Sequence, residues 1–233
     1  MIRKIFLLGI FFLFCSATVT LAQKNVTSMW PYKYPDFLDG IVYFKNQKPL
    51  SERVNIHLLK STLHYLEGDQ IKEATTSAIV YVLINNSVQD VSVPDRYYMY
   101  DDQLVRLVSG DSSAFVAELV LVDFSVKERG GAYGASSSVQ GTRDLSSLPN
   151  RGISSTSEME LKNKKDEGEL LSVSKKYFMI VGGKVYPATR KEIESKLPAD
   201  RKDAFKQFIK KNKISWKDPV SLATLLEFLK NVQ

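Results

Sequence analysis

The sequence predicts an α+β fold, with an antiparallel β-sandwich or meander body followed by a small C-terminal helical unit. The chain has 233 residues, of which 44% are hydrophobic and 25% charged, ordinary values for a globular protein with a substantial core. Short segments rich in Val, Ile, Tyr and Phe alternate with turn pairs over residues 30–124, which is typical of antiparallel strands. After Pro187 the hydrophobic period changes from about two to about 3.6 residues, which indicates helices.

Residues 1–22 are typical of a secretory signal peptide. Arg3 and Lys4 precede an apolar run over residues 5–14, and Ala22 is the small residue that signal peptidase requires before the cut. The apolar run is too short to span a membrane. Cleavage would remove Cys15, the only cysteine, so we expect no disulfide and no cysteine-bound metal. We therefore expect an exported protein, periplasmic or associated with the outer membrane of a Gram-negative bacterium, with no transmembrane segment after cleavage.

Residues 23–128 are expected to form the antiparallel β body. Alternating apolar residues from Val54 to Leu58 predict a half-buried strand, and the apolar run over residues 114–124 predicts a long one. Pairs of adjacent turn-forming residues between such segments predict hairpins, because tight turns favour residues that adopt positive φ. In the predicted β body these pairs are Asp39-Gly40, Gly68-Asp69 and Asp101-Asp102.

The second half of the chain divides into three segments. Residues 129–160 are rich in glycine and serine and show no hydrophobic period, so we expect a flexible loop, either functional or a plain insertion, with the insertion favoured. Residues 161–187 predict a β-hairpin that joins the body, with Gly182-Gly183 at its turn. Residues 188–233 predict a basic helical unit.

Capping residues divide this unit into three helices. Thr189 and Glu192 match a capping box, Asp200 precedes a second helix, and Asp218 with Pro219 opens a third. Two apolar stripes at helical spacing predict that the second and third helices pack as an αα-hairpin. The stripes are Phe205, Phe208 and Ile209, and Leu222, Leu225, Leu226 and Leu229.

The chain is segregated in charge. Residues 161–233 hold 17 basic and 9 acidic side chains, whereas residues 23–160 hold 13 and 17. Lys206, Lys210 and Lys211 lie on the predicted basic unit and are candidates for binding a partner, either an envelope protein assembly or an anionic envelope surface. The alternative is a solvated helix face. Export argues against nucleic acid as the partner.

No complete catalytic, cofactor or metal motif is present, so we expect no enzyme, no cofactor, and no catalytic or metal-binding residue. His57 and His64, the only histidines, are predicted to be partly exposed on neighbouring strands of one hairpin. The blocks at residues 110–112 and 172–175 match fragments of serine-hydrolase motifs but lack their partner residues. A carboxylate-dependent glycan hydrolase is the least favoured alternative.

Aromatic residues near the mature N-terminus form a second candidate surface. Trp30, Tyr32 and Tyr34 alternate loosely with polar residues and prolines. On an exposed sheet face these rings would stack on sugars or anchor an interface, which makes a carbohydrate-binding module the second hypothesis. The alternative is that they cover the edge of the core.

Four segments carry a resemblance to known proteins. They are the aromatic opening from Tyr32 to Gly40, the strand Val54-Asn55-Ile56, the strand Lys176-Tyr177-Phe178, and the closing stretch from Phe208 to Lys213. In these the chain resembles uncharacterised small secreted envelope proteins of Bacteroidota. The resemblance implies a periplasmic or outer-membrane location and no particular activity, so it assigns no functional residue. The leading hypothesis is a non-catalytic envelope protein that binds a macromolecular partner.

Overall fold

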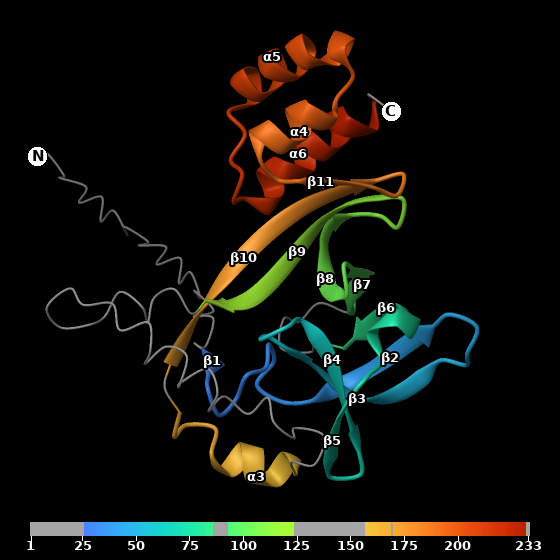
Figure 1. The fold of residues 1–233 in the computed structure, drawn as a ribbon, viewed down its shortest axis with the longest axis vertical. Helices are drawn as coiled ribbons and strands as arrows, with labels where there is room; N and C mark the ends of the chain where they lie inside the picture. Colours follow the sequence, from blue (N-terminus) through green and yellow to red (C-terminus); the bar gives the residue numbers. More distant parts are fainter. Residues whose placement is uncertain (1–25, 86–92, 124–156, 169, 232–233) are drawn as a thin grey trace, which may run out of the picture.

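The structure, a computed structural model, describes residues 26–85, 93–123, 157–168 and 170–231 (Figure 1). The predicted signal peptide and almost all of the predicted loop 129–160 lie outside these residues. Eleven strands of the described residues form one antiparallel sheet in the order β1-β10-β9-β8-β7-β6-β2-β3-β4-β5, and β11 pairs with β10. The protein is therefore α+β with a β-rich body, as predicted. The strands are β1 (Val26–Thr27), β2 (Leu38–Phe44), β3 (Leu50–His57), β4 (Thr62–Glu67), β5 (Gln70–Glu73), β6 (Ile79–Ile84), β7 (Asp95–Tyr100), β8 (Gln103–Gly110), β9 (Ala114–Asp123), β10 (Leu170–Val181) and β11 (Lys184–Pro187).

The sheet consists of two meanders joined side by side. Strands β2 to β5 pair in sequence order, as do β6 to β10, and pairing of β2 with β6 joins the two sets. The sheet curls so that the β3–β4 turn of the first meander reaches strands of the second and forms hydrogen bonds with them. The Ser61 hydroxyl and the Leu104 amide each donate across this contact at 2.7 Å, and the Val122 amide donates to the Leu58 carbonyl at 3.0 Å. The curl encloses the body core.

Two apolar cores share one face of strand β9. Alternate residues of a strand point to the same face. Ala114 and Val116 contact the helical unit, whereas Val120 and Val122 belong to the body core. Glu118 lies between them and is buried. The long strands β8, β9 and β10 therefore support both the body and the helical unit, with a charged residue at the boundary.

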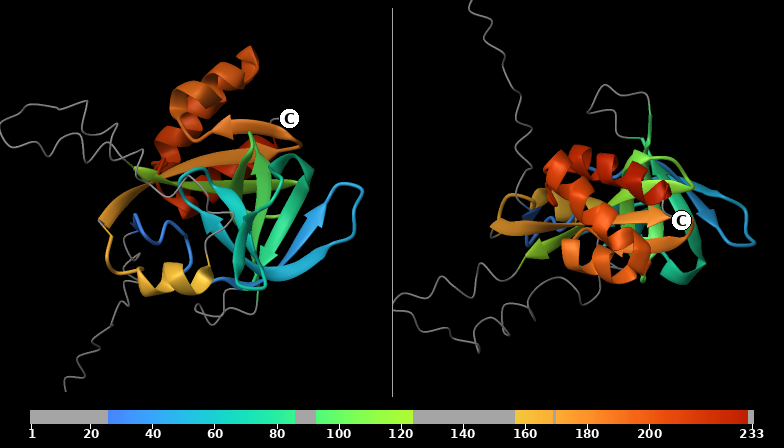
Figure 2. Two further views of the ribbon diagram at one scale, coloured as in Figure 1. Left: turned by 60° about the horizontal axis from the view of Figure 1, so that its bottom comes forward. Right: turned by 90° about the horizontal axis from the view of Figure 1, so that it is seen from above.

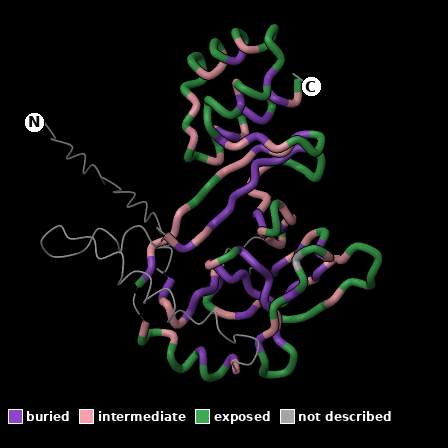
Figure 3. The backbone as a smooth tube through the Cα atoms, viewed as in Figure 1, coloured by how far each residue is buried: buried purple, intermediate pink, exposed green. Residues whose placement is uncertain are grey.

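The helical unit contains α4 (Arg190–Lys196), a 3₁₀ turn η5 (Ala199–Arg201), α5 (Lys202–Asn212) and α6 (Pro219–Lys230). Helix α6 packs on β8, β9 and β10, α4 packs on β11, and α5 lies farthest from the sheet (Figures 1 and 2). The rings of Phe205 and Phe208 lie 6.1 and 4.7 Å from the ring of Phe228, which confirms the αα-hairpin. The outer side of α5 is mostly exposed (Figure 3).

Local capping decides where two of these helices begin. The Asp218 carboxylate accepts from the amides of Val220 and Ser221 at 3.2 and 3.1 Å, with Pro219 in the first turn, as predicted. Thr189 likewise caps α4. The prediction for Asp200 was wrong, because it lies inside η5 and α5 begins after Arg201 without a side-chain cap.

The turn at Asp39-Gly40 was also predicted wrongly. Both residues lie inside strand β2, whereas the other predicted turn pairs do join consecutive strands. A Cβ atom on Gly40 would lie 2.4 Å from Val54 Cγ2. The glycine is therefore needed for close packing inside the sheet, and its turn propensity is not used.

A third correction concerns residues 158–163, which form helix α3 (Glu158–Asn163). The sequence predicted the end of a loop and the start of a hairpin there. A helix of six residues is too short to show a clear period and depends on tertiary contacts. Here Leu161 packs against Trp30, Tyr32 and Phe37. A 3₁₀ turn, η1 (Thr76–Ala78), completes the secondary structure of the described residues.

Candidate functional site: a basic groove on the helical unit

The helical unit contains a groove of about 450 Å³ between α4, α5 and the α5–α6 connection. Four of its lining residues are cationic, three are apolar and none is acidic. They are Arg190, Lys206, Ile209, Lys210, Lys213, Ile214 and Trp216. The lining thus combines positive charge with an aromatic ring.

Helix periodicity brings the lysines together. Lys206, Lys210 and Lys213 follow one another at spacings of four and three residues, so they share one side of α5 and its C-terminal end. Lys213 ends the helix in a left-handed conformation with φ of 47°. The chain then turns back so that the Ile214 amide donates to the Ile209 carbonyl at 3.3 Å. This turn places Trp216 beside the lysines.

The groove cations differ in whether they are neutralised. Glu194 lies 3.4 Å from Lys206 and 3.8 Å from Arg190, and Asp203 lies 3.3 Å from Lys206. The hydrogen bonds to Asp203 and Glu194 raise the pKa of Lys206 above its ordinary value. Within the described part of the chain, Lys210 and Lys213 form no ion pair within 4.0 Å. These two ammonium groups remain available to an external anion.

The predicted lysines are only partly brought together. Lys206 and Lys210 line the groove, whereas Lys211 is exposed outside the lining, because consecutive residues lie about 100° apart around a helix. Sequence reasoning missed Arg190, Lys213 and Trp216 as site residues. Lys213 could have been identified, because its helical spacing from Lys206 and Lys210 places it on the same side of α5. Arg190 and Trp216 belong to other elements and share no local pattern with α5.

The predicted aromatic surface is corrected by the structure. Trp30, Tyr32 and Tyr34 are 5%, 2% and 5% exposed, respectively. The Trp30 indole packs edge-on against the Tyr32 and Phe37 rings at 5.3 and 6.3 Å, and its Nε1 donates to the Tyr34 carbonyl at 2.9 Å. Stacking on a sugar needs an open ring face, which these residues do not offer. Trp30 and Tyr32 pack in an apolar cluster with Leu161 of α3, which agrees with the alternative that these aromatics cover the edge of the core.

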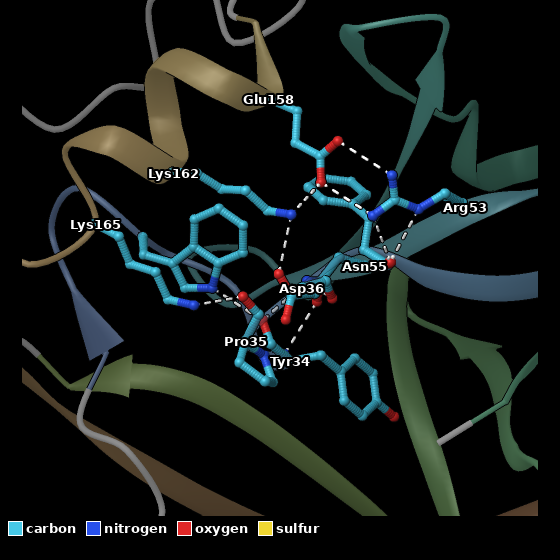
Figure 4. A network of polar contacts seen from close by, with 10 residues as sticks. Tyr34, Pro35, Asp36, Arg53, Asn55, Glu158, Lys162 and Lys165 are labelled. Carbon is cyan, nitrogen blue, oxygen red and sulfur yellow. Dashed lines mark hydrogen bonds and ion pairs between the residues drawn. The ribbon is translucent and has the colours of Figure 1, made fainter. Parts of the chain in front are cut away.

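A charged network holds helix α3 over these aromatics (Figure 4). Both Glu158 carboxylate oxygens accept from Arg53, at 3.1 and 3.2 Å. Lys162 lies 3.1 Å from Glu158 and 3.0 Å from Asp36, which follows the aromatic segment. The bidentate pair and the bridging lysine fix α3 against the start of the body.

The two histidines are also buried. His57 and His64 lie on neighbouring strands as predicted, but each is 2% exposed, so the prediction of partial exposure was wrong. Their rings stack at 4.6 Å, and the Tyr32 hydroxyl lies 2.9 Å from His64 Nδ1. Burial lowers the pKa of His57 to about 4 and that of His64 to about 3, with a smaller effect of Lys60 on both rings and of His57 on His64. Among the described residues no group of three metal-ligating side chains is found.

A row of polar side chains crosses the sheet beneath the helical unit. Tyr97, Arg106, Glu118 and Tyr177 are consecutive cross-strand partners on β7 to β10. Glu118 accepts from Arg106 at 3.0 Å and from Tyr177 at 3.2 Å, and Lys33 lies 3.6 Å away. Burial opposes ionisation of Glu118, but the nearby cations outweigh it and hold its pKa below the usual range. The row lies between the two apolar cores on the shared strands.

A second cleft, of about 590 Å³, lies where β7 diverges from β8. Its carboxylates are Asp95 and Asp111. Asp95 accepts hydrogen bonds from Arg106 and Tyr34. Asp111 accepts hydrogen bonds from the amides of Ser113 and Ala114. Burial opposes ionisation of Asp95, but its hydrogen bonds and nearby cations outweigh this and lower its pKa. Hydrogen bonds from Ser113 and Ala114 lower the pKa of Asp111 to about 2. Neither has the raised pKa of a glycosidase general acid. The basic groove is therefore the better candidate site.

Comparison of the chain with protein-family models, curated proteins and solved structures finds no match. In the described ranges no helix has the length and apolar character needed to cross a membrane. The function is therefore argued from the groove itself.

Proposed function

We propose that this protein is a non-catalytic cell-envelope protein that binds an anionic macromolecular partner through its basic groove. The observation that carries the proposal is a concave lining with four cations and no carboxylate, in which Lys210 and Lys213 lack an ion pair within the described residues. The signal-like residues 1–22 support an envelope location.

The arrangement of charges favours binding over simple solvation. A solvated helix face commonly mixes acidic and basic residues, which neutralise one another at helical spacing. On α5 the acidic residue Asp203 lies in the first turn, whereas Lys210, Lys211 and Lys213 gather at the C-terminal end. A positive surface of this kind attracts polyanions, and added salt screens this electrostatic attraction and shortens the distance over which it acts.

The proposal is tested with protein purified after export and a soluble polyanion, dextran sulfate. Binding is measured by fluorescence anisotropy of the labelled polyanion from 50 to 500 mM salt. Replacing Lys206, Lys210 and Lys213, the three lysines of the groove lining, by glutamine should weaken binding at low salt and flatten its salt dependence. A matched variant, with Lys176, Lys184 and Lys191 replaced, loses the same charge outside the groove lining. Equal losses in both variants, or binding that does not change with salt, would contradict the proposal.

A further inference from the structure

We propose that the groove binds the phosphate-bearing headgroups of an anionic phospholipid surface, with Trp216 and Val220 entering the lipid interface. This inference rests on the proposed function and names the chemical class of the partner. It commits to phospholipid because the groove combines unpaired ammonium groups with apolar side chains at the same end of the helical unit.

The apolar part of the site surrounds the α5–α6 connection. Trp216 and Ile214 are half-buried in the groove lining, and Val220, in the first turn of α6, is 75% exposed. Tryptophan is favoured at the boundary between lipid and water, where its ring is apolar and its N–H remains hydrated. Val220 follows Trp216 by four residues, and its exposed side chain gains free energy when lipid removes it from water.

The cationic part surrounds the same connection. Lys210 and Lys213 line the groove, and Lys211 and Lys217 are exposed beside it. Lysine side chains can extend along an apolar boundary and leave their ammonium groups at the level of the headgroups. Each lysine near an anionic leaflet contributes about 1 kcal/mol, which is about a fivefold gain in partitioning.

The position of the site suits a flat partner. Helix α5 lies at the end of the molecule opposite β5 and α3, with the sheet on its other side (Figure 1). The acidic residues Asp200 and Asp203 precede or begin α5, so they lie at the far end of the helix from Lys213. A surface that approaches the α5–α6 connection meets Lys210, Lys213 and Trp216. The exposed carboxylate of this connection, Asp218, accepts from the amides at the start of α6.

Trp216 provides an internal reporter for the experiment. The chain has two tryptophans, and Trp30 is buried under α3. Protein purified after export is mixed with vesicles of phosphatidylcholine alone, or of phosphatidylcholine with phosphatidylglycerol. With the anionic vesicles, tryptophan emission should shift to shorter wavelength and the protein should co-sediment. In Trp216→Phe the shift should disappear, although Trp30 is retained.

Variants separate the two contributions. Replacing Lys210 and Lys213 by glutamine should reduce partitioning into anionic vesicles about 30-fold. Replacing Lys176 and Lys184, which are exposed outside the groove, removes the same charge and should leave partitioning nearly unchanged. Val220→Ser should weaken partitioning without changing its dependence on salt. Far-ultraviolet circular dichroism of each variant checks that the fold is retained.

The outcomes distinguish this inference from the proposed function. Binding to dextran sulfate through the same lysines, without binding to anionic vesicles, would overturn the lipid inference and leave the proposed function standing. Loss of both would overturn both. Complete displacement from vesicles by millimolar inorganic phosphate, with no shift in Trp216 emission, would indicate a free anion as the ligand and would also overturn the inference.

Discussion

Acidification to pH 5 is expected to destabilise the fold through His57 and His64. Both imidazoles are buried and neutral, with pKa values of about 4 and about 3, whereas a histidine in an unfolded chain has a pKa of about 6.5. Between these values the unfolded chain binds protons that the folded chain does not, so the free energy of unfolding decreases as the pH falls. This stabilisation is complete above about pH 6.5 and is lost progressively as the pH falls toward about 4 for His57 and about 3 for His64.

The size of the effect follows from the same values. At pH 5 the unfolded histidine is almost fully protonated, which lowers the free energy of unfolding by about 2 kcal/mol per residue and about 4 kcal/mol for the pair. A typical domain is stabilised by about 5–15 kcal/mol in total, so the loss is large. Glu118 has a pKa lowered below the usual carboxyl range, and the pKa of Lys33, lowered by burial and by repulsion from Arg106, is about 8. Between pH 5 and 7.5 Glu118 stays ionised and Lys33 stays mostly protonated, so the two groups contribute little to the change.

Two measurements check this prediction. Urea unfolding at pH 7.5, 6 and 5, followed by circular dichroism, should show the free energy of unfolding fall by about 4 kcal/mol. The single variants His57→Gln and His64→Gln should each show about half of this pH dependence. Imidazole proton resonances of the folded protein should not titrate above pH 5. Resonances that titrate with a pKa above 6, or a stability that is constant from pH 7.5 to 5, would refute the reasoning.

Three further predictions concern stability, measured by urea unfolding at pH 7.5. Glu118→Gln should destabilise the fold by about 1–3 kcal/mol, because it removes the buried carboxylate from half-buried Arg106, which keeps Asp95 as its other acidic partner; an effect below 1 kcal/mol would mean that the row is hydrated. Gly40→Ala should cost about 1–3 kcal/mol, because the added Cβ would overlap Val54. Gly68→Ala adds a Cβ with no atom within 4 Å, so it should show only the cost of a positive φ, about 1 kcal/mol. Asp218→Ala should lower the free energy of unfolding by about 1 kcal/mol, because α6 loses its cap. Asp218→Asn should keep most of the stability of the cap, and an equal loss in both variants would mean that the charge, not the hydrogen bond, is responsible.

The sequence alone determined the features that depend on local chemistry. The Asp218 cap, the turn at Asp101-Asp102 and the apolar stripe from Leu222 to Leu229 each lie within about a dozen residues. Their residue types are sufficient to specify φ, a backbone hydrogen bond or a helical face. The α+β class follows from the same local periods. The cluster of lysines on α5 could be identified for this reason as well.

Only the tertiary structure decided which side chains meet and which are buried. Trp30 is removed from water by α3, which comes more than a hundred residues later and shows no clear period of its own. Gly40 matches a turn signal, but the close approach of Val54 places it inside a strand. Trp216 joins Lys210 because a left-handed residue, Lys213, reverses the chain between them. In the first two cases a contact between segments distant in the sequence outweighs local preference, because burial and packing stabilise more than the propensity of any single residue.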